Sequence, residues 1–129
     1  MKILITGYKG FIGRNLFIYL KDKGYQVEGF DWTDKIIPDI KTFDIVVHLG
    51  AISSTTERNI NKLLNQNLDF SIKLFNLCNR SNIKFIYASS ASVYGNAQKE
   101  NNIKFIKEDY PKYPLNPYAW SKYLFDRWL

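Results

Sequence analysis

The sequence predicts an α/β protein built on a doubly wound parallel sheet, and three observations carry this prediction. Short apolar runs of strand length alternate with longer segments whose apolar residues recur every three or four positions. A glycine-rich loop follows the first of these runs, and turn-forming residues separate the others. Because strands that alternate with helices pair in parallel between helical layers, this order predicts that fold.

The first part of the chain contains two predicted strands and one helix. Residues 2–6 read as a buried strand because they are apolar and β-branched and end at a glycine. A helix is predicted over residues 10–23, where apolar residues mark one side and Gly24 ends the segment. A second strand is predicted over residues 25–30, and Asp31 closes it.

The rest of the chain continues the alternation with two strands and two helices. These are a strand at residues 45–49, a helix at about 58–80, a strand at 84–88 and a helix that opens at Asn116-Pro117 and extends to Leu129. A serine-rich loop over residues 89–94 follows the last strand, and residues 95–117 are polar and turn-rich.

Length and composition bound the class of protein. The 129 residues suffice for one domain, which is predicted to span residues 1–129. Hydrophobic residues make up 46% and charged residues 23%, the balance of a folded chain rather than a disordered one. The sequence has no apolar run long enough to span a membrane and no secretory leader, which predicts a cytoplasmic protein without a membrane partner. The single cysteine, Cys78, cannot form a multi-cysteine metal site, and no metal is expected.

The charge of the chain does not indicate a nucleic acid partner. Lys plus Arg number 18 and Asp plus Glu 12, which gives a formal net charge of +6. The basic residues are scattered, most are lysines, and no arginine-rich stripe or zinc-finger spacing accompanies them. A solvated, lysine-rich surface is therefore the preferred interpretation.

Residues 7–13, Gly-Tyr-Lys-Gly-Phe-Ile-Gly, form a G-x-x-G-x-x-G loop between the first strand and the first helix. A dinucleotide pyrophosphate needs such a loop, because glycines allow a tight turn and close backbone approach while the helix start presents free N–H groups. The motif predicts a Rossmann-type NAD(P)-binding domain, with a purely structural turn as the alternative. The residues expected to bind the cofactor here are Gly7, Gly10, Phe11, Ile12 and Gly13.

Asp31 lies 18 residues after Gly13, at the end of the second predicted strand. A carboxylate at this position accepts hydrogen bonds from the adenosine ribose and repels a 2′-phosphate, which favours NAD over NADP. An ordinary turn aspartate is the alternative. Lys35 keeps NADP open, because its ammonium could pair with that phosphate.

Tyr118 and Lys122 lie four residues apart, on one face of the last predicted helix. An ammonium beside a phenol favours the phenolate and lowers a pKa that starts at about 10 toward the range of a general acid/base. Alone, this spacing is common on solvent-facing helices. Ser89 and Ser90 support a catalytic role for the pair, because they end a buried strand, where open α/β sheets bind ligands. A serine hydroxyl there could hold a substrate oxygen against Tyr118.

Together these segments resemble the extended short-chain dehydrogenase/reductase superfamily, in particular the NAD-dependent epimerase/dehydratase family of nucleotide-sugar enzymes. The resemblance covers the whole chain and rests on segments that stand in the family's order: GYKGFIG, FD at the second strand end, VVHLGA, YASSASVYG and PLNPYAWSK. The segments that look most like the ADP-glyceromanno-heptose 6-epimerases of that family are residues 53–57, 87–90 and 114–116, followed by Tyr118 and residues 121–126.

The resemblance implies a reaction and three catalytic residues. Tyr118 would be the acid/base and also a contact of the cofactor. Lys122 would be its electrostatic partner and a ligand of the cofactor ribose, and Ser90 the family's catalytic serine in contact with substrate. The implied chemistry is transient oxidation and re-reduction of a carbon of a nucleotide-sugar, with NAD as the cofactor and NADP as the alternative.

The same resemblance assigns further residues to the cofactor or the substrate. These are Leu49, Gly50 and Ala51 along the cofactor, and Ser53 and Ser54 facing the cofactor or the sugar. Asn67 matches a family asparagine, with a structural role and a cofactor contact as the two alternatives. A homo-oligomer is also implied, because family members commonly dimerise through the long helix and the Tyr-Lys helix.

Two features depart from the family pattern. Only 12 residues separate Asp31 from Asp44, where the family fits a helix, a third strand and another helix. Residues 36–40 are expected to keep the third strand, with at least one helix shortened or absent. The family also continues for a comparable length beyond the position of Leu129, so the chain is expected to be an N-terminal part without the substrate domain.

An epimerase is the function favoured by the sequence, and two alternatives stay open. The first is a nucleotide-sugar reductase or dehydratase of the same superfamily. Dehydratases commonly carry an acidic pair beside the catalytic serine or threonine, whereas Ser90 is followed here by Ala-Ser. The second alternative is a non-catalytic dinucleotide-binding module.

Overall fold

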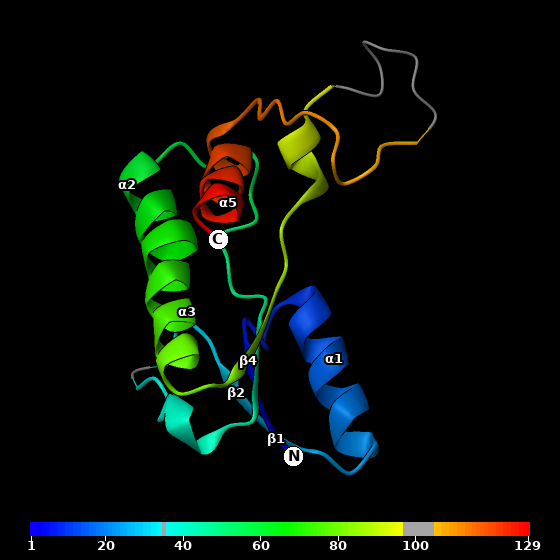
Figure 1. Cartoon of the computed structure of the whole chain (residues 1–129), viewed down its shortest axis with the longest axis vertical. Helices are drawn as coiled ribbons and strands as arrows, with labels where there is room; N and C mark the ends of the chain where they lie inside the picture. The colour runs from blue at the N-terminus through cyan, green and yellow to red at the C-terminus, as the bar shows by residue number, and fades with distance from the viewer. Residues whose placement is uncertain (35, 97–104) are drawn as a thin grey trace. The chain divides into compact units, whose positions relative to one another are not determined.

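The structure is a computed structural model that describes residues 1–34, 36–96 and 105–129 (Figure 1). The chain forms two compact units. The sheet unit comprises residues 1–51 and 70–88, and the helical unit comprises residues 52–69 and 89–129. The single domain predicted for residues 1–129 stays a prediction.

Four parallel strands form the centre of the sheet unit, in the order β2-β1-β3-β4. They are β1 (Lys2–Thr6), β2 (Gln26–Phe30), β3 (Ile45–His48) and β4 (Lys84–Tyr87). The register pairs Thr6 with both Phe30 and His48, and it pairs His48 with Tyr87. All four strands therefore end at the same edge of the sheet, where ligands of open α/β sheets bind.

Helices cover both faces of this sheet. α1 (Phe11–Asp22) lies on the face that carries Ile3 and Ile5, and α3 (Phe70–Arg80) lies on the face that carries Leu4. Figure 1 shows α1 and α3 on either side of the strands. Successive residues of a strand point to opposite faces, which is why the wholly apolar β1 can contribute to both cores. The doubly wound, Rossmann-type arrangement predicted from the sequence is confirmed.

The connection from β2 to β3 differs from the sequence prediction. A third strand is predicted at residues 36–40, and this prediction is wrong, because none of these residues belongs to a strand. A 3₁₀ helix, η1 (Ile40–Thr42), begins there instead. Pro38 has no N–H to donate to a neighbouring strand, and Ile40 and Phe43 are buried in the core on the α3 side. The short segment thus fills the core rather than extending the sheet.

The helical unit is built around the C-terminal helix. Its elements are α2 (Ile60–Leu63), the π-helical turn η2 (Leu64–Asp69), the 3₁₀ turn η3 (Ala91–Tyr94) and α5 (Pro117–Trp128). α5 packs on η2 and η3. Asn116 caps α5, because its side-chain oxygen accepts a hydrogen bond from the Ala119 N–H at 2.8 Å. The cap and the proline that follows it confirm the helix start predicted from the sequence.

Candidate functional site

The glycine loop adopts a conformation that side chains would block. Gly7 has φ +71°, and a Cβ there would lie 2.7 Å from the Gly50 Cα. A Cβ at Gly13 would overlap the carbonyl oxygen of Gly7. The Gly10 N–H closes the turn by donating to that same oxygen at 3.0 Å. The turn and the close approach of helix to strand both require glycine, as the motif predicts.

The start of α1 is open to an anion. Gly10 precedes the helix, and among the described residues no side chain caps it and no acidic residue stands in its first turn. Phe11 and Ile12 are exposed. The first backbone N–H groups of a helix lack intrahelical partners and carry the positive end of its dipole, so this end of α1 fits the diphosphate of a dinucleotide.

A buried chain of hydrogen bonds fixes the segment after β3 against the glycine loop. The Gly50 N–H donates to Thr6 Oγ1 at 3.1 Å, and Thr6 Oγ1 lies 2.6 Å from His48 Nδ1. The second ring nitrogen of His48 lies 2.8 Å from Ser71 Oγ, and His48 is only 1% exposed. His48 is thus a structural strand residue. The neighbouring Leu49 and Ala51, both half-buried, continue the segment that the sequence assigns to the cofactor.

The ribose end of the predicted site contains an ion pair that the sequence analysis did not assign. Asp31 follows β2, and its backbone N–H donates to Asp34 Oδ2 at 2.7 Å. Lys9, from the glycine loop, donates to the other Asp34 oxygen at 2.5 Å and to Thr33 Oγ1 at 2.7 Å. The hydrogen bond from Lys9 lowers the pKa of Asp34, and the same bond raises the pKa of Lys9. Lys35, which keeps NADP open in the sequence prediction, lies outside the described residues.

The catalytic residues implied by the resemblance all lie in the helical unit. Tyr118 is half-buried in the first turn of α5, and Lys122 follows one turn later on the same face. Ser121 Oγ donates to the Tyr118 carbonyl at 2.7 Å, which ties the two turns of the helix together. Ser90 caps η3, where its hydroxyl oxygen accepts a hydrogen bond from the Ser92 N–H at 3.2 Å.

Lys122 is buried, with 4% of its surface exposed. Burial disfavours the charged form and lowers the pKa of Lys122 to about 8, and the nearby charge of Asp126 acts in the opposite direction. Asp126 in turn accepts a hydrogen bond from Ser89 Oγ at 2.6 Å. Asp126 is not among the site residues predicted from the sequence, although its position four residues after Lys122 on a predicted helix indicates that the two side chains can interact.

Asn67 makes structural contacts from the π-helical turn η2. Its side-chain oxygen accepts from the Ile52 N–H at 2.8 Å, and its amide donates to the Ile52 carbonyl at 3.0 Å and to Ser121 Oγ at 2.9 Å. Asn67 is fully buried. These bonds support the structural alternative, and the cofactor contact stays a prediction. Ser53 and Ser54, assigned to cofactor or sugar, are both exposed.

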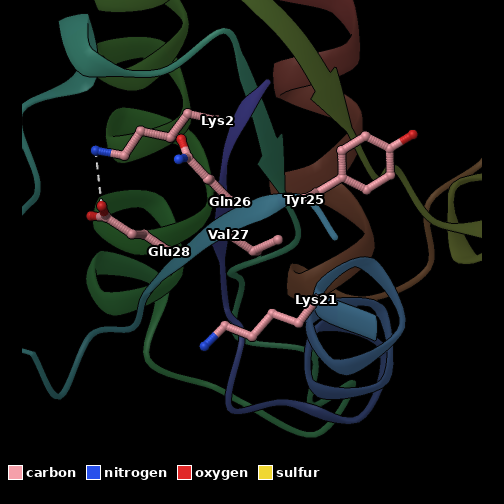
Figure 2. A pocket seen from close by; sticks show the side chains of 6 residues that line it. All are labelled: Lys2, Lys21, Tyr25, Gln26, Val27 and Glu28. Carbon is pink, nitrogen blue, oxygen red and sulfur yellow. Dashed lines mark ion pairs between the residues drawn. The ribbon is translucent and has the colours of Figure 1, made fainter. Parts of the chain in front are cut away.

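An open pocket of about 600 Å³ lies elsewhere in the sheet unit, beside the beginnings of β1 and β2. Figure 2 shows its lining, with Lys2 and Glu28 joined by an ion pair of 2.9 Å and Lys21 extending from α1. Because strand beginnings lie at the sheet edge opposite the glycine loop, this pocket is separate from the predicted cofactor site.

Among the described residues, no helix is long and apolar enough to cross a membrane, and no group of three His, Cys, Asp or Glu side chains could hold a metal ion.

Comparisons with known proteins identify the family. Residues 3–129 match the model of the NAD-dependent epimerase/dehydratase family. The chain belongs to this family, and the resemblance inferred from the sequence is confirmed. NAD, the cofactor expected from the sequence, is confirmed at the level of the family.

Individual relatives are similar over nearly all of this chain. The ADP-L-glycero-D-manno-heptose-6-epimerase of Fusobacterium nucleatum is 32% identical over 154 aligned positions, which cover 98% of this chain and 46% of the relative. The crystal structure of the Helicobacter pylori enzyme of the same name has a TM-score of 0.78 at 25% identity and covers 98% of this chain and 49% of that one. The structure of MoeE5 in complex with UDP-glucose and NAD has a TM-score of 0.84 at 26% identity. The match covers 98% of this chain and 47% of MoeE5. The chain thus spans about half the length of these relatives.

Proposed function

We propose that this chain is the cofactor-binding part of an NAD-dependent nucleotide-sugar epimerase of the ADP-heptose 6-epimerase type. The observation that carries the proposal is the burial of Lys122 one helical turn from Tyr118. Burying an ammonium costs stability, so a chemical use for its charge is the simplest reason for its position. The names of the relatives supply the reaction and the class of substrate.

The residues of the sheet unit would hold the cofactor. The start of α1, with Gly7, Gly10, Phe11, Ile12 and Gly13, would bind the diphosphate, and the Asp31 carboxylate would accept hydrogen bonds from the adenosine ribose. Leu49, Gly50 and Ala51 would lie along the bound molecule. When bound, NAD supplies the hydride acceptor and donor that epimerisation of a sugar carbon requires.

The residues of the helical unit would move and hold the proton. Tyr118 takes the proton of a sugar hydroxyl, and the Lys122 ammonium stabilises the phenolate that does so. Ser90 donates a hydrogen bond to the same sugar oxygen, which fixes the substrate against Tyr118. With the pKa of Lys122 at about 8, the side chain is still mainly an ammonium at neutral pH. Ser53 and Ser54 would contact the cofactor or the sugar from the exposed segment that follows β3.

An apolar groove of the helical unit supports a homo-oligomer. A groove of about 450 Å³ between α2 and α5 is lined mainly by apolar side chains, among them Ile60, Trp120 and Leu124. These three side chains are 39–50% exposed. Exposed apolar surface on the two helices would be covered by the same helices of a second copy.

The cytoplasm is the proposed location, where a lone buried cysteine such as Cys78 stays reduced.

The test has a binding step and a turnover step. The 129-residue chain is titrated with NADH and with NADPH, following the nicotinamide fluorescence. NADH is expected to bind more tightly than NADPH, and Asp31→Arg is expected to weaken NADH binding. In the natural full-length protein, Tyr118→Phe should reduce epimerisation of ADP-heptose by roughly 10²–10⁴-fold, while the variant still binds NADH.

Each failure has a distinct meaning. If a folded chain binds neither dinucleotide, the cofactor site itself is refuted. NADH binding with no turnover of any nucleotide-sugar would favour the non-catalytic module. Turnover with net reduction or loss of water would favour the reductase or dehydratase alternative. If Tyr118→Phe keeps more than about a tenth of the wild-type rate, Tyr118 is not the acid/base.

A further inference from the structure

One carboxylate joins the two halves of the predicted cofactor site. Asp34 binds the Asp31 backbone N–H with one oxygen and the Lys9 ammonium with the other. Lys9 belongs to the glycine loop, which faces the diphosphate, whereas Asp31 begins the turn that faces the ribose. Asp34 therefore connects the diphosphate end to the ribose end through its two oxygens.

Fold stability does not explain this pair. The Lys9 side chain is 45% exposed and that of Asp34 29%, and pairs this accessible to water contribute little to stability. Geometry explains it better, because the ammonium has two oxygen partners in the turn, Asp34 Oδ1 and Thr33 Oγ1. The pair holds a positive charge beside the turn that bears Asp31 and neutralises it there.

We propose that Asp34 determines the preference for NAD over NADP, because it occupies the Lys9 ammonium and so withholds from a 2′-phosphate the cation that would bind it. This inference rests on the proposed function, in which Asp31 receives the adenosine ribose. With Lys9 engaged by Asp34, the side chains of Lys9, Asp31 and Asp34 carry a net negative charge. Among the described residues of this end, the two carboxylates repel a 2′-phosphate, and the Lys9 ammonium is already paired with Asp34.

The substitution Asp34→Asn separates the charge of Asp34 from its shape. An asparagine oxygen can still accept from the Asp31 N–H, so the turn keeps its hydrogen bond while Lys9 loses its counterion. The ratio of NADPH to NADH dissociation constants, measured by fluorescence titration of the 129-residue chain, should fall by about tenfold. This gain in relative NADPH affinity should be smaller at high salt, because it comes from a charge near the surface.

Lys9→Met tests the same pair in the opposite direction. It leaves Asp34 as an additional negative charge, so the ratio should rise by about tenfold, mainly through weaker NADPH binding. In the double variant Lys9→Met/Asp34→Asn the ratio should return to within about threefold of wild type, since one positive and one negative charge are removed together and the ammonium that Asp34→Asn would release is absent. Asp22→Asn, at the other end of α1, is the matched control for the loss of one negative charge and should leave the ratio unchanged.

The outcomes separate this inference from the proposed function. If the folded wild-type chain binds no NADH, the cofactor site of the proposed function is wrong. If it binds NADH and Asp34→Asn leaves the ratio within about twofold of wild type, or if the gain persists in the double variant, only the role of Asp34 is overturned. Circular dichroism establishes that each variant is folded, and Lys9→Met carries the test by itself if Asp34→Asn does not fold.

Discussion

Lys122 and Asp126 lie one turn apart on α5, and the carboxylate counteracts the effect of burial on the lysine. Burial lowers the pKa of Lys122 to about 8, while the charge of Asp126 raises it. Ser89, a residue of the serine-rich loop, donates a hydrogen bond from its hydroxyl to the Asp126 carboxylate at 2.6 Å. The protonation of the proposed electrostatic partner of Tyr118 therefore depends on a residue outside the Tyr-x-x-x-Lys motif.

Removing the Asp126 charge should shift the alkaline limit of activity. In Asp126→Asn the pKa of Lys122 should fall further below 8, so the ammonium is lost at lower pH. The pH profile of kcat for the full-length protein should lose its alkaline limb about one pH unit earlier. Ser89→Ala keeps the carboxylate and should leave the limb near its wild-type position. A drop in stability without this shift would show that Asp126 is only structural.

The buried lysine should make the chain less stable at neutral pH than above its pKa. The pKa of Lys122 is about 8 in the folded state against 10.5 for an unperturbed lysine, so between these values the unfolded chain binds more protons and stability rises with pH. Lys122→Met should raise the free energy of unfolding at pH 7 by up to about 3 kcal/mol and abolish this rise. Urea unfolding across the pH range measures both. The exposed Lys107→Met should change neither, and an equal effect there would contradict the assignment.

Gly13 should tolerate no side chain, for a reason specific to the cofactor loop. A Cβ in Gly13→Ala would overlap the Gly7 carbonyl, so the loop must move away from α1. NADH affinity should fall more than about tenfold and stability by about 1–3 kcal/mol. Gly24→Ala is the matched control, because Gly24 has φ +81° but nothing within 4 Å of an added Cβ. It should cost about 1 kcal/mol of stability and leave NADH affinity unchanged.

Most elements of the fold could be predicted because their signals are local. β1, α1 and α5 begin and end within about one residue of the predicted positions, since apolar runs, Gly24 and the Asn116 cap act on their own neighbours. The prediction of a strand at residues 36–40 was wrong. It followed the family pattern, although Pro38 lacks an N–H and the connection is short. The π-helical turn η2 interrupts a smooth helical pattern. Its buried Asn67 bonds to Ile52 and Ser121, which are distant in sequence.

The site shows the same division between local and distant signals. The glycine loop could be located from spacing, because tight turns need glycine wherever they occur. Lys9 and Asp34 are 25 positions apart, and no sequence pattern indicates that they pair. Only the parallel pairing of β1 with β2 brings the loops after these strands to one edge of the sheet. Interactions of this kind need the tertiary structure.

Asn67 offers a test of the structural alternative against the cofactor contact. Asn67→Ala would leave the Ile52 backbone and the Ser121 hydroxyl without these partners in a buried place, and stability should fall by about 2–4 kcal/mol. Asn65→Ala, exposed in the same turn, should change stability by less than about 0.5 kcal/mol. The NADH affinity of the folded fraction then decides between the roles. An unchanged affinity supports a structural residue, and a loss of about tenfold would assign a cofactor contact.

The apolar groove of the helical unit should control association if a second copy covers it. Trp120, 48% exposed on α5, lines the groove, and a glutamate in its place would bring a charge into the proposed interface. Light scattering after gel filtration should give about twice the chain mass of 15.1 kDa for the wild type and the single-chain mass for Trp120→Glu. Arg127→Glu, an exposed change on the same helix that does not line the groove, should remain a dimer. A monomeric wild-type chain, or a Trp120→Glu variant that still dimerises, would remove α2 and α5 from the interface.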